Sequence, residues 1–271
     1  AVLPEWRERL AAIGLARNTD WQILTSEDTV SASYKTTNNF RFKLADGSRI
    51  FFKRYVYNKV RLKHWLQPSK AAVEAAGFSE LRQLGIPTLE VLAYGEQRRF
   101  GLLQASFIAT LGVPDVIELD QYLARHWHGL PYDRKMAVLA NLQPLLAMQL
   151  QTTHNAGFFH WDLKLRNILL QRQQEQTNLI WIDCPRSRRK AANEFHGVVT
   201  DLAAMARVGC RVLTWGQQMR FLLQYTNQDH NLARRLYRAV AQELKKRPPR
   251  PFWHLLSRDD PEFIRNISKQ D

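Results

Sequence analysis

Cysteine and long apolar runs are scarce in this sequence. The 271 residues include two cysteines, Cys184 and Cys210, which is too few for a disulfide framework or a cysteine-based zinc site. No apolar run approaches the length that crosses a bilayer, and Ala1–Glu8 has neither a basic leader nor an apolar core. These absences argue against a disulfide-rich secreted protein and against a membrane channel. We expect reduced thiols and a chain that remains in the cytoplasm.

Acidic residues are the second shortage. Lys and Arg number 39 against 25 Asp and Glu, which gives a formal charge of +14. Such a surplus indicates an anionic partner, and nucleic acid, acidic lipid head groups and phosphorylated sugars are all candidates. A basic surface kept only for solubility explains the surplus less well, because the positive charges cluster. With 45% hydrophobic and 24% charged residues, the chain otherwise has an ordinary globular composition and is long enough for a two-lobed enzyme.

The hydrophobic pattern predicts strands in the first part of the chain and helices in the second. The expected strands cover residues 21–24, 40–44, 49–55, 89–95 and 100–110. The expected helices cover residues 4–16, 71–84, 120–127 and 136–154, and a further one starts at Thr200. The segment with Gly112 and Pro114 is the expected hinge between the two parts. This order of elements predicts an α+β fold.

Two polar residues stand close together in the loop segment Gly157–Leu170. The loop can turn Asp162 and Asn167 into one cleft, where a carboxylate accepts a hydroxyl proton and an amide oxygen ligates a hard cation. Asp183 ends the apolar run Leu179–Ile182, where a second carboxylate can hold Mg²⁺ against nucleotide phosphates. Ordinary capping and loop roles are the alternative for these residues. Their order along the chain favours metal-assisted phosphoryl transfer.

The segment His160–Asn167 resembles the protein-kinase catalytic loop, H-R-D-L-x-x-x-N, at its His, Asp, Leu and Asn positions. Asp183 stands where the D-F-G aspartate would stand, and Lys53 has the position of the strand lysine that pairs with nucleotide phosphates. Glu74 is the expected acidic partner of Lys53, with Glu80 as the alternative.

The resemblance implies a protein-kinase-like two-lobed fold. A small antiparallel β-sheet would form the N-lobe over residues 1–111, together with a helix at the amino terminus and a helix that carries Glu74. A helical C-lobe over residues 112–271 would carry the catalytic loop.

Three features differ from protein kinases. Residues 26–39 contain no glycine, so backbone amides or hydroxyl side chains would have to cover the phosphates in place of a glycine-rich loop. Asp183-Cys184-Pro185 replaces D-F-G, and no A-P-E follows. Trp161 replaces the arginine that would pair with a phosphorylated loop, so control by loop phosphorylation is not expected.

The whole set is similar to the lipopolysaccharide kinase family, whose members phosphorylate Kdo or heptose of the lipid A inner core. The resemblance also covers Leu84–Thr88 and the basic residues after Asp183, and it spans about residues 20–210. It implies ATP and Mg²⁺ as cofactors and a sugar hydroxyl of an anionic glycolipid as acceptor. It further implies peripheral binding at the cytoplasmic face of the inner membrane. No nucleic acid partner is expected.

In this interpretation, Asp162 orients and deprotonates the sugar hydroxyl, and Lys164 neutralises the transferred phosphate. Asn167 and Asp183 hold Mg²⁺, and Lys53 binds the α- and β-phosphates.

The remaining candidates bind the acceptor or support the loop. The anionic groups of the acceptor are assigned to Arg186, Arg188 and Arg189, because clustered arginines suit a phosphorylated or carboxylated ligand. His160 is expected to brace the catalytic loop, and Asp201 resembles the aspartate that holds the backbone of this loop in kinase-like folds.

Two other functions remain open. A protein Ser/Thr kinase is favoured by Lys164, two residues after Asp162, but the missing glycine loop and A-P-E argue against it. A non-catalytic pseudokinase that binds membrane or nucleic acid would explain the charge but not the ordered catalytic set. The basic stretch Asn58–Lys70, with Trp65, suits an anionic interface or a solvated connection about equally.

Overall fold

The computed structural model describes residues 1–16, 21–25, 29–33, 37–57, 65, 67–127, 129–173 and 176–246. The glycine-free loop is therefore only partly covered, since residues 26–28 and 34–36 lie outside the described residues. Most of the basic stretch over residues 58–70 lies outside them as well. Among the described residues, no helix combines the length and the apolar character that a membrane span requires.

Two compact units make up the chain. The first comprises Ala1–Gln83, Thr88–Pro114 and Cys184–Arg186, and the second comprises Leu84–Pro87, Asp115–Asp183 and the residues from Ser187 onward. Both units are discontinuous in sequence. The sequence predicted a boundary between residues 111 and 112, on the assumption that the chain passes only once from the first part to the second. This boundary stays a prediction.

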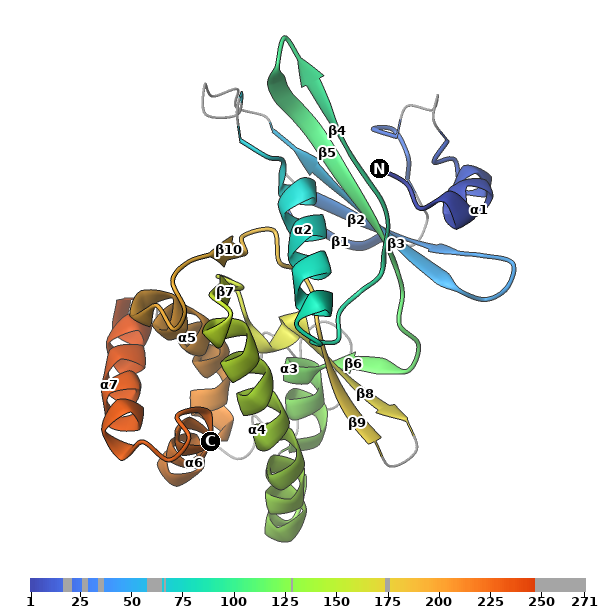
Figure 1. Ribbon diagram of the computed structural model, residues 1–271. Helices are drawn as coiled ribbons and strands as arrows, with labels where there is room; N and C mark the ends of the chain where they lie inside the picture. The colour runs from blue at the N-terminus through green and yellow to red at the C-terminus, as the bar shows by residue number, and fades with distance from the viewer. Residues whose placement is uncertain are drawn as a thin grey trace. The chain divides into compact units, whose positions relative to one another are not determined.

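An antiparallel sheet with the strand order β1-β2-β3-β5-β4 is the centre of the first unit (Figure 1). Its strands are β1 (Thr29–Ser33), β2 (Thr37–Lys43), β3 (Arg49–Val56), β4 (Val91–Arg99) and β5 (Leu102–Leu111). The helical elements of this unit are η1 (Pro4–Trp6), α1 (Arg7–Ala12) and α2 (Lys70–Gln83).

Strand β3 separates the apolar face of this sheet from the face that carries Lys53. Successive side chains of a strand point to opposite faces, so Ile50 and Phe52 share one face. They are buried in a cluster with Trp6 and Leu10 of the N-terminal helices. Lys53, which is paired with Ile108 of β5 and Asn39 of β2, therefore projects from the other face.

The first strand lies later in the sequence than the hydrophobic pattern indicated. Trp21–Leu24 was expected to be a strand, but it forms a turn and a bend, and β1 begins at Thr29. Trp21 and Leu24 pack against the N-terminal cluster, and the Trp21 ring lies 4.8 Å from that of Phe107. The apolar residues of this segment therefore pack a turn against the sheet and do not belong to a strand.

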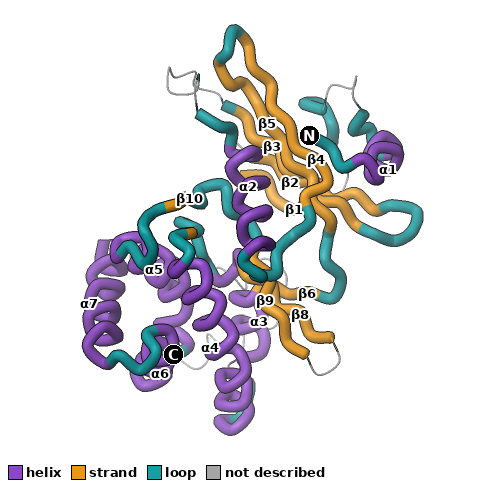
Figure 2. Tube along the Cα trace, in the orientation of Figure 1, coloured by secondary structure: helices purple, strands orange, loops and turns teal. Residues whose placement is uncertain are grey.

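The second unit is mainly helical and contains two small sheets. Its strands are β6 (Val116–Glu118), β7 (Phe158–Phe159), β8 (Ile168–Gln173), β9 (Gln176–Trp181) and β10 (Arg188–Arg189), arranged as β6-β8-β9 and β10-β7. Its helices are α3 (Leu119–Tyr122), η3 (Leu123–Trp127), α4 (Tyr132–Asn155), η4 (Leu165–Asn167), α5 (Phe195–Val212), α6 (Trp215–Tyr225) and α7 (His230–Lys246). Figure 2 shows helices α4, α5, α6 and α7 grouped together, and strands β6, β8 and β9 lie beside α3. The α+β class predicted from the sequence is confirmed.

Helix α5 begins earlier than expected. The sequence placed its start at Thr200, but the helix runs from Phe195. Glu194 caps it, accepting hydrogen bonds from the backbone N–H groups of His196 and Gly197 at 3.2 and 2.6 Å. Glutamate is not among the preferred N-cap residues, and the sequence signal for this boundary was therefore weak.

Helix α4 is attached to strand β9 by a buried amide. Gln149, which is 2% exposed, donates from its side chain to the Leu179 carbonyl at 2.9 Å. Its side-chain oxygen accepts a hydrogen bond from the Trp181 indole N–H at 2.8 Å. Because Trp181 is fully buried, water cannot replace this partner.

Replacing Gln149 with Leu should destabilise the second unit, because it keeps the volume but leaves the Trp181 indole N–H without an acceptor. We expect the free energy of unfolding to fall by about 2 to 4 kcal/mol in urea titrations followed by circular dichroism. Adding Trp181→Phe removes the orphaned donor, so the double variant should lose clearly less than the sum of the single losses. Strictly additive losses would contradict the role given to this pair.

Candidate active site

Lys53 forms a buried ion pair with helix α2. Its ammonium lies 3.1 and 3.3 Å from the two carboxylate oxygens of Glu74. The Tyr55 hydroxyl donates to the same carboxylate at 2.6 Å. Glu74 is 3% exposed, so water hardly reaches its carboxylate, and hydrogen bonds such as these stabilise the buried charge. Of the two acidic residues proposed from the sequence, Glu74 is the one that the structure shows beside Lys53.

The residue that follows Asp183 contacts the same helix. Cys184 is fully buried, and its thiol donates to the backbone carbonyl of Glu74 at 3.6 Å. Cys184 and Glu74 both belong to the first unit. A small thiol therefore occupies the position that a phenylalanine has in the D-F-G motif.

The catalytic-loop candidates lie together in the second unit. The Lys164 ammonium lies 2.7 Å from a carboxylate oxygen of Asp162. The Asn167 side-chain N–H donates to the Asp162 backbone carbonyl at 2.8 Å, and the Lys164 N–H donates to the same carbonyl at 2.8 Å. The Asp162 and Lys164 side chains are 24% and 30% exposed, so both can meet a substrate.

Asp201 fixes the backbone of this loop through two hydrogen bonds. Its carboxylate accepts hydrogen bonds from the N–H groups of His160 and Trp161 at 2.8 and 2.7 Å. Trp161 has a positive φ of 62°, which is unfavourable for a bulky residue. The two hydrogen bonds offset this strain and set the direction of the chain just before Asp162.

Two aromatic residues support Asp201 in turn. His154 is fully buried and lies 3.5 Å from the Asp201 carboxylate through Nε2. The Tyr225 hydroxyl lies 2.8 Å from His154 Nδ1. Burial, and secondly the charge of Asp201, raises the pKa of Tyr225, so the phenol keeps its proton.

The strand end before Asp183 is attached to the same loop. His160 Nε2 lies 3.0 Å from the Ile182 carbonyl, and the Ile182 N–H donates to the Asn167 carbonyl at 2.9 Å. Asp183 itself has a φ of 60°. Backbone strain of this kind is often found at functional positions, and here it occurs at Asp183 and at Trp161.

The residues present suit Mg²⁺ held jointly with a phosphate. The described residues contain no cluster of three or more His, Cys, Asp or Glu side chains that could hold a metal alone. Mg²⁺ commonly takes one or two protein oxygens and completes its shell with water and substrate phosphate. The Asn167 side-chain nitrogen donates to Asp162, which leaves its amide oxygen as the atom available to a cation.

The three candidate arginines have different surroundings. Arg188 and Arg189 form β10, which pairs with β7. The Arg188 guanidinium lies 5.1 Å from the centre of the Trp161 ring, one residue from Asp162. Arg189 donates to the Ala156 carbonyl at 3.0 Å, so it supports the end of α4. Arg186 belongs to the first unit.

Sequence reasoning missed Tyr55, His154 and Tyr225 as parts of the site. Tyr55 could have been found, because it stands two residues after Lys53 and therefore shares its face of β3. His154 lies at the end of the expected helix over residues 136–154, where no local pattern marks it. Tyr225 lies 71 residues from His154 in sequence, and no local pattern connects the two.

Removing the Asp201 carboxylate should destabilise the second unit strongly, since two buried N–H groups would lose their acceptor. We expect Asp201→Ala to lower the free energy of unfolding by about 3 to 5 kcal/mol in chemical denaturation. Asp229 is the matched control, because it also accepts from two backbone N–H groups, those of Asn231 and Leu232, both at 2.9 Å, but in an exposed position. Asp229→Ala should lower it by about 1 kcal/mol. Equal losses in the two variants would count against Asp201 as the anchor of the loop.

Comparisons with known proteins agree with this geometry. The model of the lipopolysaccharide kinase (Kdo/WaaP) family matches residues 37–242, a range that contains all the candidate residues. The structure is similar to a solved structure described as "WaaP in complex with acyl carrier protein", with a TM-score of 0.63 and 20% identity, covering 82% of this chain and 89% of that chain. At this identity the likeness shows the fold alone, and it confirms the protein-kinase-like fold predicted above. No curated protein sequence matches the chain. The family match confirms the resemblance seen in the sequence: the chain belongs to the lipopolysaccharide kinase (Kdo/WaaP) family, whose members are phosphotransferases.

Proposed function

We propose that this protein transfers the γ-phosphate of ATP to a hydroxyl of Kdo or heptose in the lipopolysaccharide inner core. The proposed place of the reaction is the cytoplasmic face of the inner membrane. Membership of the family supports the reaction class. The observation that carries the proposal is the Asp162–Lys164 pair, 2.7 Å apart, on a loop whose backbone Asp201 holds.

Asp162 is the proposed base. Its carboxylate accepts the proton of the sugar hydroxyl as that oxygen bonds to the γ-phosphorus and the bond to the β-phosphate oxygen breaks, which releases ADP. Lys164 can neutralise the negative charge of the transferred phosphate, because its ammonium already lies beside the Asp162 carboxylate. Most of the rate would come from positioning and charge neutralisation.

The nucleotide phosphates are assigned to Lys53, Asn167 and Asp183. Glu74, itself held by the Tyr55 hydroxyl, keeps the Lys53 ammonium in one position, so little side-chain entropy remains to be lost when a phosphate binds. Asn167 and Asp183 would supply oxygen ligands to Mg²⁺, which neutralises charge on the phosphates when bound.

The anionic groups of the acceptor are assigned to the basic segment after Asp183. Arg188 is the best placed of the three arginines, because it stacks on Trp161 next to Asp162. Arg189 keeps one guanidinium N–H on the Ala156 carbonyl, beside β10. Arg186 is exposed and completes the set. An acyl carrier protein, the partner in the solved WaaP complex, is a further proposed partner.

Transfer of label from ATP to purified lipid A core glycolipid tests the proposal directly. Asp162→Asn should lower kcat by about 100-fold to 10,000-fold, the usual contribution of a positioned base. A generic protein substrate runs in parallel with the glycolipid. Label that appears on protein alone would instead favour the protein-kinase alternative that Lys164 suggested.

The Lys53–Glu74 pair predicts a second kinetic effect. In Glu74→Gln the neutral amide no longer holds the ammonium by charge, so we expect KM for ATP to rise about tenfold, with KM for the glycolipid little changed. Glu80→Gln, on the same helix, is the matched control and should behave like the unmodified protein. If both variants raise KM for ATP equally, the assigned pairing has no special part in nucleotide binding.

A further inference from the structure

The turn between β4 and β5 has an unusual sequence. Arg99 pairs with Leu102 across the hairpin, which leaves Phe100 and Gly101 as a two-residue loop. Both have a positive φ, 50° and 79°, as in a type I′ turn, whose first position prefers Asn, Asp or Gly. An aromatic residue there is strained, by about 1 to 2 kcal/mol.

Phe100 gains no packing in return for this strain. Its side chain is 88% exposed, more than any other large hydrophobic side chain among the described residues. Folding stability alone would favour asparagine at this position. A strained, exposed aromatic side chain at the end of a hairpin therefore indicates a function outside the fold.

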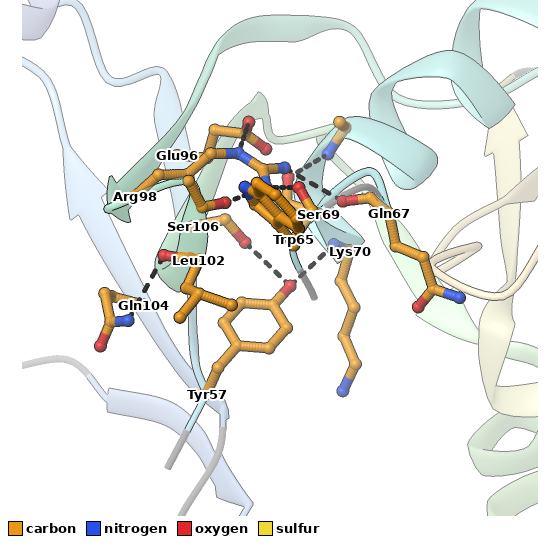
Figure 3. Close-up of polar contacts among 12 residues, drawn as sticks. Tyr57, Trp65, Gln67, Ser69, Lys70, Glu96, Arg98, Leu102, Gln104 and Ser106 are labelled. Carbon is orange, nitrogen blue, oxygen red and sulfur yellow. Dashed lines mark hydrogen bonds and ion pairs between the residues drawn. The ribbon is translucent and has the colours of Figure 1, made fainter. Parts of the chain in front are cut away.

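A second exposed aromatic residue lies against the same turn. Trp65 is 57% exposed, and a Cβ atom on Gly101 would collide with its indole ring, so Gly101 leaves the space that the ring occupies. Arg98 fixes this arrangement by donating to the backbone carbonyls of Trp65, Gly101 and Gln67, each at 3.0 Å (Figure 3). Trp65 is thus held against the hairpin that carries Phe100.

Basic residues accompany the two exposed aromatic residues, Phe100 and Trp65. Glu96 is the one acidic residue in the hairpin over residues 91–111, and Arg98 pairs with it at 2.7 Å. The exposed Arg99 guanidinium lies 5.6 Å from the centre of the Phe100 ring and forms no ion pair with any residue that the structure describes. In sequence, Lys59, Arg61 and Lys63 precede Trp65. Net positive charge therefore accompanies the exposed rings.

Aromatic side chains flanked by Arg and Lys are the groups that bind the interface of an anionic bilayer. The rings sit at head-group depth, and the cations contact lipid phosphates. A protein partner fits less well, since a two-residue turn and one indole are small beside the roughly 800 Å² per partner that a stable protein interface buries.

We infer that Phe100 and Trp65 insert into the head-group layer of an anionic membrane and that Arg99 contacts lipid phosphates there. This inference rests on the proposed function, which places the acceptor in a membrane, and it identifies the surface that meets that membrane.

Phe100→Asn tests the inference without harming the fold, because asparagine suits a type I′ turn. Its thermal midpoint should equal or exceed that of the unmodified protein. In flotation with phosphatidylglycerol–phosphatidylethanolamine vesicles, it should bind about tenfold more weakly, the loss expected when one aromatic side chain leaves an apolar layer.

Arg99→Gln should bind severalfold more weakly and with a smaller salt dependence. Binding to neutral phosphatidylcholine vesicles should be weak for every form.

Ile23→Asn is the matched control. Ile23 is 77% exposed in the same unit, but it adjoins Trp21 and Leu24, which pack on the N-terminal cluster. This variant should bind the vesicles like the unmodified protein. Unchanged vesicle binding by Phe100→Asn would overturn the inference. If that variant loses acyl carrier protein binding and keeps vesicle binding, the hairpin is a protein-docking surface and the membrane assignment is wrong.

A second assay separates this inference from the proposed function. Phosphorylation of a soluble, deacylated core oligosaccharide should be the same for Phe100→Asn and the unmodified protein, while phosphorylation of vesicle-embedded glycolipid should fall in the variant. If neither acceptor is phosphorylated by either form, the proposed function fails, and the vesicle-binding result still decides the role of the hairpin.

Discussion

The catalytic loop depends on one buried carboxylate. Asp201 accepts the N–H groups of two consecutive residues, His160 and Trp161, and this double contact compensates the left-handed backbone of Trp161. His154 contacts this carboxylate, and the protonated Tyr225 in turn contacts His154. The position of Asp162 is therefore determined by a chain of contacts that begins in helices α4, α5 and α6. Preorganisation of this kind keeps a reacting group in place without reorganisation during the reaction.

In the first unit, Glu74 has the comparable role. It receives the Lys53 ammonium, the Tyr55 hydroxyl and, at its backbone carbonyl, the Cys184 thiol. In protein kinases the residue after the D-F-G aspartate is a phenylalanine whose packing distinguishes active from inactive states. Here the small, buried Cys184 forms a direct contact with α2. We interpret this as a fixed connection in place of a packing switch, which agrees with the expectation that loop phosphorylation does not control this protein.

Among the described residues, three of the seven non-glycine positions with a positive φ also have a proposed function. Trp161, Asp183 and Phe100 all have positive φ values, and each such residue costs about 1 to 3 kcal/mol. At Trp161 the Asp201 hydrogen bonds offset the cost. The Phe100 side chain is 88% exposed and gains little packing among the described residues, so a membrane that accepts the ring would explain why the residue is there.

The sequence by itself determined the order of the catalytic residues, the α+β class and the family resemblance, because these depend on local spacing and on the alternation of apolar residues. It also limited the partner of Lys53 to two glutamates on one helix. Tertiary structure decided between Glu74 and Glu80, because the choice depends on which turn of α2 faces β3. It also turned Trp21–Leu24 from an expected strand into a packed turn and brought Tyr225 to His154. Such contacts join residues far apart in the chain, and only the folded backbone brings them within hydrogen-bonding distance.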